Sequence, residues 1–492
     1  MTSNRFRALG LAAVIAACVM DLLDSTVVQL AAPAIRAELG GSYSSLQWMT
    51  AGYTMAMAVA LLVGGRLGDM FGRRRVLLAG VAGFTLASVA CGLAWAPEAL
   101  IGARVLQGLF GAVMLPQTFG LIRELFGPND MAKVWGVFGP VMGLSALLGP
   151  ILAGVIIDAD VFGTGWRMIF LLNVPVGLFS LLAGLRFLPK SAPTMRGARL
   201  DGLGVLVAAA GTFLLVFPLV QGRELGWPMW TKLSLLVALP VLAGFGWYQV
   251  ARKRAGRVTL VEPGTFKNRS YTFGVVLAVV FTAAMGGTML LLSVLMQLGL
   301  GFSPLRASLS SLPWALGTVV GTMLSGQLMA RFGRKLLHVG FAVMAAGLVS
   351  LLVVFKLVGA EMGGWDFVLP TVLGGIGMGM IFGPLFDIIT AKVTDEQVGS
   401  ASGVLQSVQQ LGMSLGIAVL GTVYFGHAAD RAAAGAGHRE AFLDAAQLTG
   451  VITVAMLALA FGLAFLLPRK ARQHAAPATE EVVEEERELV AV

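Results

Sequence analysis

Fourteen apolar runs follow one another along these 492 residues, and they leave few folds open. A membrane-spanning helix needs about 20 predominantly apolar residues, and in hydrocarbon only helices and closed barrels satisfy all their backbone hydrogen bonds. The chain is 57% hydrophobic and 12% charged, whereas soluble domains are about a quarter charged. We therefore predict an all-α integral membrane protein. Its expected spans are 9–32, 47–65, 75–95, 99–121, 134–157, 167–187, 202–221, 232–251, 271–296, 306–330, 336–358, 367–389, 399–425 and 447–467.

A short charged turn, residues 65–75, joins the second and third runs. It reads Gly-Arg-Leu-Gly-Asp-Met-Phe-Gly-Arg-Arg-Arg, and its five charges cannot lie in hydrocarbon, so it must face water. A weaker copy occupies 326–335, where Phe-Gly-Arg recurs at an offset of 261 residues. A helix-turn-helix that occurs twice in one chain is typical of a duplicated transporter.

The positions of the two turns indicate how the chain is divided. Two spans precede the first turn and ten precede the second, whereas a plain duplication of six-helix halves would place eight there. The surplus is a pair of helices within 200–252. We therefore predict an N-terminal six-helix bundle (1–190), an inserted helix pair (191–252), a C-terminal six-helix bundle (253–468) and an acidic cytoplasmic tail (469–492).

Basic residues are distributed unequally between the two sets of loops. With the N-terminus inside, 25 Lys and Arg residues fall on the cytoplasmic side and 8 on the other. By the positive-inside rule, both termini then face the cytoplasm. The same rule accounts for the net charge of +9, which therefore does not indicate nucleic-acid binding.

The sequence shows no motif of an enzyme or a metal site. Cys18 and Cys91 lie inside apolar runs, and the four histidines lack metal-ligand spacing. The chain also has no Gly-x-x-x-x-Gly-Lys-Ser/Thr loop, which would cradle the phosphates of ATP. We expect neither an enzyme nor a bound metal or cofactor.

Further motifs show a family resemblance. They are Leu-Asp-Ser-Thr-Val-Val-Gln-Leu-Ala-Ala-Pro at 23–33, Arg-Val-Leu-Gln-Gly at 104–108, and the Gly-Pro pairs at 139–140 and 149–150. With the paired turns, they make the chain resemble the major facilitator superfamily, specifically its fourteen-span drug:proton antiporters of the EmrB/QacA type. The resemblance implies two pseudo-symmetric six-helix bundles plus the inserted pair. It also implies alternating access, with a proton gradient as the energy source.

Asp21 and Asp24 are the first candidates for proton coupling. They are three residues apart, hence on roughly one helix face. An ionisable side chain in hydrocarbon costs about 2.5–3.5 kcal/mol or more, so it needs a partner or a function. Arg104 lies at a depth similar to that of Asp24, so it is the expected partner of Asp24, directly or through water. The hypothesis is that Asp24 carries the proton and Arg104 modulates it; the alternative is a static buried pair.

The candidates for a conformational switch lie at the turn and in the fifth span. Asp69 precedes Arg73 by four residues, so the pair, together with Gly65 and Gly72, is interpreted as a cytoplasmic latch. The second copy has Ala330 in place of the acid, so such a latch belongs to the N-terminal half. A plain positive-inside anchor is the alternative. In the fifth span the candidates are Gly139, Pro140, Gly149 and Pro150, which favour a kinked and tightly packed helix.

Residues of both halves are candidates for contact with the substrate. Asp387, in the twelfth span, is a further candidate for proton coupling. Flexible methionines and aromatic rings provide the adaptable apolar surface of a promiscuous site. Ordinary helix packing is the alternative for each of these side chains. The predicted substrate-binding residues are Asp24, Tyr53, Gln107, Met285, Met289, Phe382, Phe386, Gln406 and Gln410.

The sequence thus predicts an antiporter in the cytoplasmic membrane. It would export hydrophobic, amphipathic or cationic compounds in exchange for protons. We expect it to act as a monomer in the lipid bilayer and to bind no nucleic acid. The alternatives are a selective exporter of one metabolite, a lipid flippase of the same fold, and a transporter-shaped sensor or assembly partner that moves nothing.

Overall fold

The computed structural model describes residues 3–126, 131–160, 163–190, 192–193, 200–391, 393 and 395–468, and these contain helices and no strand. The predicted all-α fold class is confirmed. The predicted tail lies outside the described residues. The helices are α1 (Ser3–Leu39), α2 (Tyr43–Phe71), α3 (Arg73–Gly92), α4 (Pro97–Phe126), α5 (Met131–Asp158), α6 (Arg167–Leu171), α7 (Asn173–Phe187), α8 (Gly202–Gln221), α9 (Met229–Arg254), α10 (Arg269–Val294), α11 (Pro304–Phe332), α12 (Arg334–Val358), α13 (Val368–Thr390), α14 (Asp395–Ala433) and α15 (His438–Ala464).

Each predicted span corresponds to a helix. Thirteen helical segments of the described chain are long and apolar enough to cross a membrane, and the 28-residue α5 accounts for the remaining predicted span. The sixth span consists of α6 and α7, which are separated at Leu172, three residues before a proline that has no N–H to donate. The helices α1 and α14 extend beyond the predicted 9–32 and 399–425, because helix continues into polar residues outside the apolar run.

Both copies of the charged turn have the same backbone design. Gly72 (φ 91°) separates α2 from α3, and Gly333 (φ 49°) separates α11 from α12. These positive φ angles favour glycine. Arg74, just after the first turn, donates to the carbonyl of Gly184 at 3.4 Å, and Arg334 donates to that of Phe465 at 2.7 Å. Each copy thus ties an early helix of its half to the last helix of that half.

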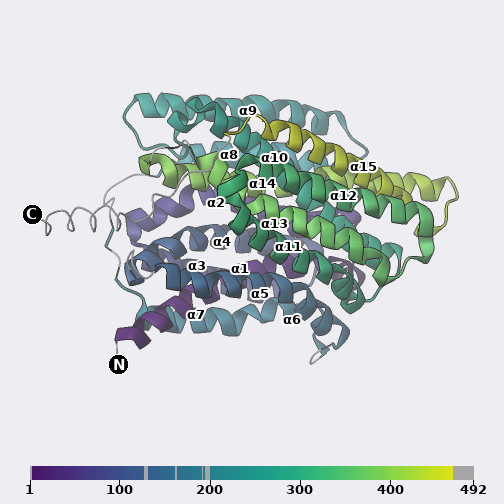
Figure 1. Cartoon of the computed structure of the whole chain (residues 1–492), viewed down its shortest axis with the longest axis horizontal. Coiled ribbons are helices and arrows are strands. Elements are labelled where there is room, and N and C mark those ends of the chain that lie inside the picture. The colour runs from purple at the N-terminus through teal and green to yellow at the C-terminus, as the bar shows by residue number, and fades with distance from the viewer. Residues whose placement is uncertain are drawn as a thin grey trace, which may run out of the picture.

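The helices lie side by side along one direction, so the molecule has two ends (Figure 1). We call the end at which α1 begins, with the turns at Gly72 and Gly333, the turn side, and the other end the far side. The helices α1 to α7 pack together as one half and α10 to α15 as the other. The halves meet mainly where α2 packs on α14 and α5 on α11.

Three large groups of buried apolar residues show how the halves are joined. One group contains far-side residues of both halves, such as Ile35 and Phe170 together with Leu420 and Phe442. The other two groups lie toward the turn side, and each belongs to a single half. The halves therefore share a core on the far side and have separate cores on the turn side.

The inserted pair lies along one edge of the molecule, with α9 outermost (Figure 1). Its inner helix, α8, packs on α2 of one half and α14 of the other. The outer helix packs mainly on α8, and large apolar side chains such as Leu236 and Trp247 remain exposed on it. Exposed apolar side chains on a membrane helix are suited to contact with lipid.

Candidate functional site

A buried ion pair lies at the centre of the N-terminal half. The Arg104 guanidinium, on α4, donates to the Asp24 carboxylate, on α1, and each side chain is 1% exposed. The pairing predicted from the similar depth of the two residues is confirmed. Removing one partner of such a pair leaves an uncompensated charge in the interior, so the two residues constrain each other strongly.

Three further polar side chains complete this network. Gln107 donates to Asp24 at 2.7 Å and to Ser88 Oγ at 2.7 Å, and its own carbonyl oxygen accepts from Arg104 at 2.6 Å. Asn173, at the start of α7, donates to Asp24 at 3.1 Å and to Ser88 at 3.2 Å. Four helices therefore contribute to one closed set of hydrogen bonds, as buried polar groups require.

Sequence reasoning missed Ser88 and Asn173. The available signal was a lone amide in the apolar run Leu171-Leu172-Asn173-Val174, because an unpaired amide is costly in hydrocarbon. That signal does not name the partner, since Asn173 reaches Asp24 across 149 residues of chain.

A second acid, Asp21, lies beside the network with a different partner. The Tyr53 hydroxyl, on α2, donates to the Asp21 carboxyl at 2.5 Å. The Arg104 guanidinium stands over the face of the Tyr53 ring, 4.2 Å from its centroid. Tyr53 therefore connects the two acids physically, with its hydroxyl on Asp21 and its ring against the cation that pairs with Asp24.

Glycines on α4 allow these side chains to approach. A Cβ at Gly108 would lie 2.4 Å from the backbone oxygen of Tyr53, so α2 and α4 could not pack as closely with any other residue there. A Cβ at Gly111 would lie 2.9 Å from the Asp21 carboxyl. The predicted substrate residues Tyr53 and Gln107 are fully buried inside this half, and their contact with substrate stays a prediction.

The charged turn forms a small ion-pair network within the N-terminal half. Arg73 lies 3.7 Å from Asp69 and 3.4 Å from Glu124 at the end of α4, and all three side chains are about one third exposed. Gly65 is exposed, and a Cβ there would make an ordinary contact with Pro116 at 3.9 Å, whereas Gly72 makes the turn itself. The described ion pairs of Arg73 join helices of the N-terminal half to one another and do not connect the two halves. The cytoplasmic latch therefore stays a prediction.

The fifth-span candidates lie on α5. Gly149 is buried, and a Cβ there would lie 2.5 Å from Thr26 Oγ1 on α1, while Pro150 is half-buried beside it. The surroundings of Gly139 and Pro140 lie outside the described part of the chain. The tight α1–α5 packing expected from the glycines is present at Gly149.

The candidates in the C-terminal half are spread over several environments. Met285, Met289 and Phe386 pack in the turn-side core of that half, whereas Phe382 is 50% exposed. The amide of Gln410 lies 3.1 Å from Met57 Sδ of the other half. Gln406 and Asp387 are half-buried, and Asp387 has an interaction partner.

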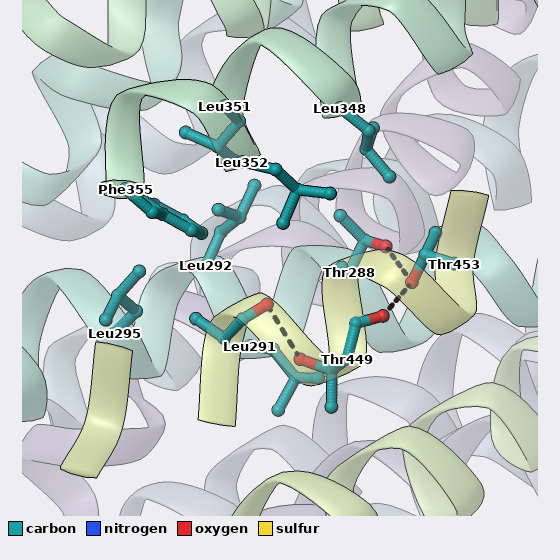
Figure 2. Close-up of a pocket in the computed structure, with 12 residues that line it drawn as sticks. Thr288, Leu291, Leu292, Leu295, Leu348, Leu351, Leu352, Phe355, Thr449 and Thr453 are labelled. Carbon is teal, nitrogen blue, oxygen red and sulfur yellow. Dashed lines mark hydrogen bonds between the residues drawn. The ribbon is translucent and has the colours of Figure 1, made fainter. Parts of the chain in front are cut away.

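A small cavity lies between α10, α12 and α15, and none of the predicted substrate residues lines it (Figure 2). Its volume is about 40 Å³, which is far below the roughly 300–1,000 Å³ of drug-sized sites. Half of the residues that line it are leucines, and the hydroxyls of Thr288, Thr449 and Thr453 donate to backbone oxygens. Among the described residues, no three His, Cys, Asp or Glu side chains are placed to hold a metal.

Comparisons with known proteins give a consistent result. The sequence profile described as Major Facilitator Superfamily matches residues 13–417. The chain is 47% identical over 428 residues to the "Probable actinorhodin transporter" of Streptomyces coelicolor, covering 86% of this chain and 73% of that relative. It is 36% identical to the "Tetracenomycin C resistance and export protein" of Streptomyces glaucescens, covering 84% and 75%. An auto-inhibited POT family peptide transporter has the same fold, with a TM-score of 0.68 at 14% identity and coverage of 96% and 99%.

Proposed function

The chain belongs to the major facilitator superfamily, and on that premise we propose that it exports lipophilic small molecules from the cell in exchange for protons. It is a multi-pass membrane transporter and not an enzyme. The substrates proposed are hydrophobic, amphipathic or cationic compounds, in line with relatives named as a probable transporter of actinorhodin and a resistance and export protein for tetracenomycin C. The proposed location is the cytoplasmic membrane, with the turn side and both termini in the cytoplasm, as the distribution of basic residues favours.

The observation that carries proton coupling is the pair of buried acids beside Arg104. Ionisable residues within membrane helices are rare, and they commonly mark proton or substrate pathways. Asp24 pairs with Arg104, Asp21 accepts a hydrogen bond from Tyr53, and the Tyr53 ring packs against the Arg104 guanidinium. Protonation of one of these acids would therefore change the contacts between α1, α2 and α4.

Alternating access is supported by the arrangement of the apolar cores. The halves share an apolar core on the far side and have separate apolar cores on the turn side, which supports a state that is closed on the far side. Rocking one half against the other would break the far-side core and bring the two turn-side cores together. A monomer contains all the parts that this movement needs.

A selective exporter of one metabolite is the second candidate, because both relatives above carry the name of a single compound. The test uses purified protein in liposomes with an imposed pH gradient and a panel of cationic dyes, antibiotics and fluorescent lipids. We expect movement of several dyes or antibiotics that stops when a protonophore collapses the gradient. Movement of one compound would select the second candidate, and movement of lipid without dye would refute the proposal.

A further inference from the structure

The two buried acids have very different partners. Asp24 accepts hydrogen bonds from the Arg104 guanidinium and from the amides of Gln107 and Asn173. A carboxylate with a cation and two amide donors is stabilised in its ionised form even when it is buried. Its residue is 3% exposed, so water has little access to it.

Asp21 lacks such compensation. Its described hydrogen bond comes from a neutral group, the Tyr53 hydroxyl at 2.5 Å, and in the described part of the chain no cation forms an ion pair with it. The residue is 9% exposed and therefore less enclosed than Asp24. It lies three residues nearer to the turn side, about 4.5 Å along the helix, where the two halves have separate cores.

The charged and titratable groups around Asp21 are few. They are Cys18 and Asp24 on α1, Tyr53 on α2 and Arg104 on α4. Helices α5, α6, α7, α10 and α11 also pack against α1, but their charged residues lie near the helix ends. A change in the charge of Asp21 therefore acts first on its hydrogen bond with Tyr53. Through the Tyr53 ring it then acts on Arg104.

We propose that Asp21 is the carboxyl that takes up and releases the transported proton, while Asp24 remains ionised as the fixed partner of Arg104. The proposal rests on the proton-coupled export proposed above. On release, the proton leaves the Asp21 carboxyl for a water molecule, and the carboxylate that remains accepts the hydrogen bond of the Tyr53 hydroxyl. Uptake reverses these steps. This assignment replaces Asp24, the proton carrier that the sequence suggested.

Infrared difference spectroscopy tests the assignment without any substrate. In wild-type protein, titration between acid and neutral pH should show the carbonyl band of a protonated carboxyl in an apolar environment. Asp21→Asn should abolish that band. The double variant Asp24→Asn/Arg104→Gln, which removes both charges and so avoids an unpaired one, should keep it. Loss of the band in the double variant, or its persistence in Asp21→Asn, would overturn the proposal.

Transport in liposomes separates this proposal from the proposed function, with ethidium as the probe. Wild-type protein should accumulate ethidium under a pH gradient and should also exchange it without one. Asp21→Asn should lose the gradient-driven movement at least tenfold and keep the exchange. Gradient-driven transport that survives in Asp21→Asn would refute the assignment. No movement of ethidium by wild-type protein would count against the proposed function, while the infrared result would still decide the assignment.

An independent set of contacts concerns the inserted helix pair. Near its far-side end, α8 binds both halves through its backbone: Ser44 of α2 donates to the Val220 carbonyl at 2.9 Å, and Thr422 of α14 donates to that of Leu219. Just beyond, Arg223 donates to the Phe425 carbonyl at 3.0 Å.

The segment that makes these contacts is firmly held. Glu224 accepts from the backbone N–H of Ser44 at 3.0 Å, and Val216 and Val220 are buried against Ala418 of α14. Gly222 lies under the Trp227 ring, where a Cβ would be 2.7 Å from the ring. We propose that residues 216–227 are a clamp that holds the two halves together on the far side. The inserted pair would then determine the free-energy cost of opening the far side.

Distances between spin labels on the two halves test the clamp. Leu93→Cys and Trp365→Cys provide exposed labelling sites at far-side ends, and the native cysteines are buried. Thr422→Val and Arg223→Ala should each raise the ratio of far-side-open to closed molecules about fivefold, the effect of losing one typical hydrogen bond. The control Lys232→Ala removes an exposed charge near the start of α9 and should change nothing. Unchanged distances in both clamp variants, at an unchanged Tm, would refute the clamp.

Discussion

The strongest test of the buried network is a double-mutant cycle on Asp24 and Arg104. Each side chain is 1% exposed, so removing one charge leaves the other buried without its partner. Asp24→Asn leaves the Arg104 cation with the Gln107 carbonyl oxygen at 2.6 Å and the Met49 backbone oxygen at 3.1 Å, both uncharged. We expect each single variant, Asp24→Asn or Arg104→Gln, to lower the free energy of unfolding by about 3–5 kcal/mol.

The double variant should behave differently, because it buries no charge. The two amide side chains that replace the ion pair would remain within reach of the amides of Gln107 and Asn173, so we expect a loss no greater than that of the worse single variant. The coupling energy should then be at least about 3 kcal/mol, since each single loss is of that size. Equilibrium unfolding in mixed micelles, followed by tryptophan fluorescence, measures it. If the two single losses add to within about 0.5 kcal/mol, the residues act independently and the reasoning fails.

Two further predictions follow from the packing and from the base of α8. Gly108→Ala places a Cβ 2.4 Å from the Tyr53 backbone oxygen and should lower the free energy of unfolding by about 1–3 kcal/mol. The control Gly102→Ala, where a Cβ has nothing within 4 Å, should be neutral or slightly stabilising. Equal melting temperatures of the two variants would contradict this prediction. Burial raises the pKa of Asp201, but hydrogen bonds, first of all from Gln249, lower it below its usual value. Asp201→Asn should therefore destabilise the protein at neutral pH. The difference from wild-type protein should shrink as the pH falls below about 3.9, the unfolded value, and should be lost once the pH is below the lower pKa of the folded state. An equal loss in stability at every pH would refute this prediction.

The latch interpretation of the turn can be examined separately. Arg73 lies close to both Asp69 and Glu124, and all of these side chains are about one third exposed. Exposed ion pairs contribute about 0–1 kcal/mol. Asp69→Asn should therefore change Tm little. If Asp69 takes part in conformational switching, the variant should show a large fall in transport at unchanged Tm. Unchanged transport would leave the turn as a structural anchor.

Much of this architecture could be predicted from the chain alone. The number of spans follows from the thickness of hydrocarbon, and the duplicated halves follow from a turn that recurs at a constant offset. The pairing of Asp24 with Arg104 could also be predicted, because opposite charges at similar depth in a membrane each need a partner. These properties depend on the length and polarity of each segment, and the sequence displays both.

The remaining partners were decided by the tertiary structure. Asn173 meets Asp24 across 149 residues, and Ser44 meets Val220 across 176, because helix packing brings them together. The residues of the C-terminal half that were predicted to contact the substrate also separate into packed, half-buried and exposed positions, which helix faces alone do not reveal. By itself the sequence determined which groups had to be buried and at what depth. Only the packing of the helices decided that Asp24 has a cation and Asp21 has a hydroxyl, since this depends on which side chains face each other across the interior.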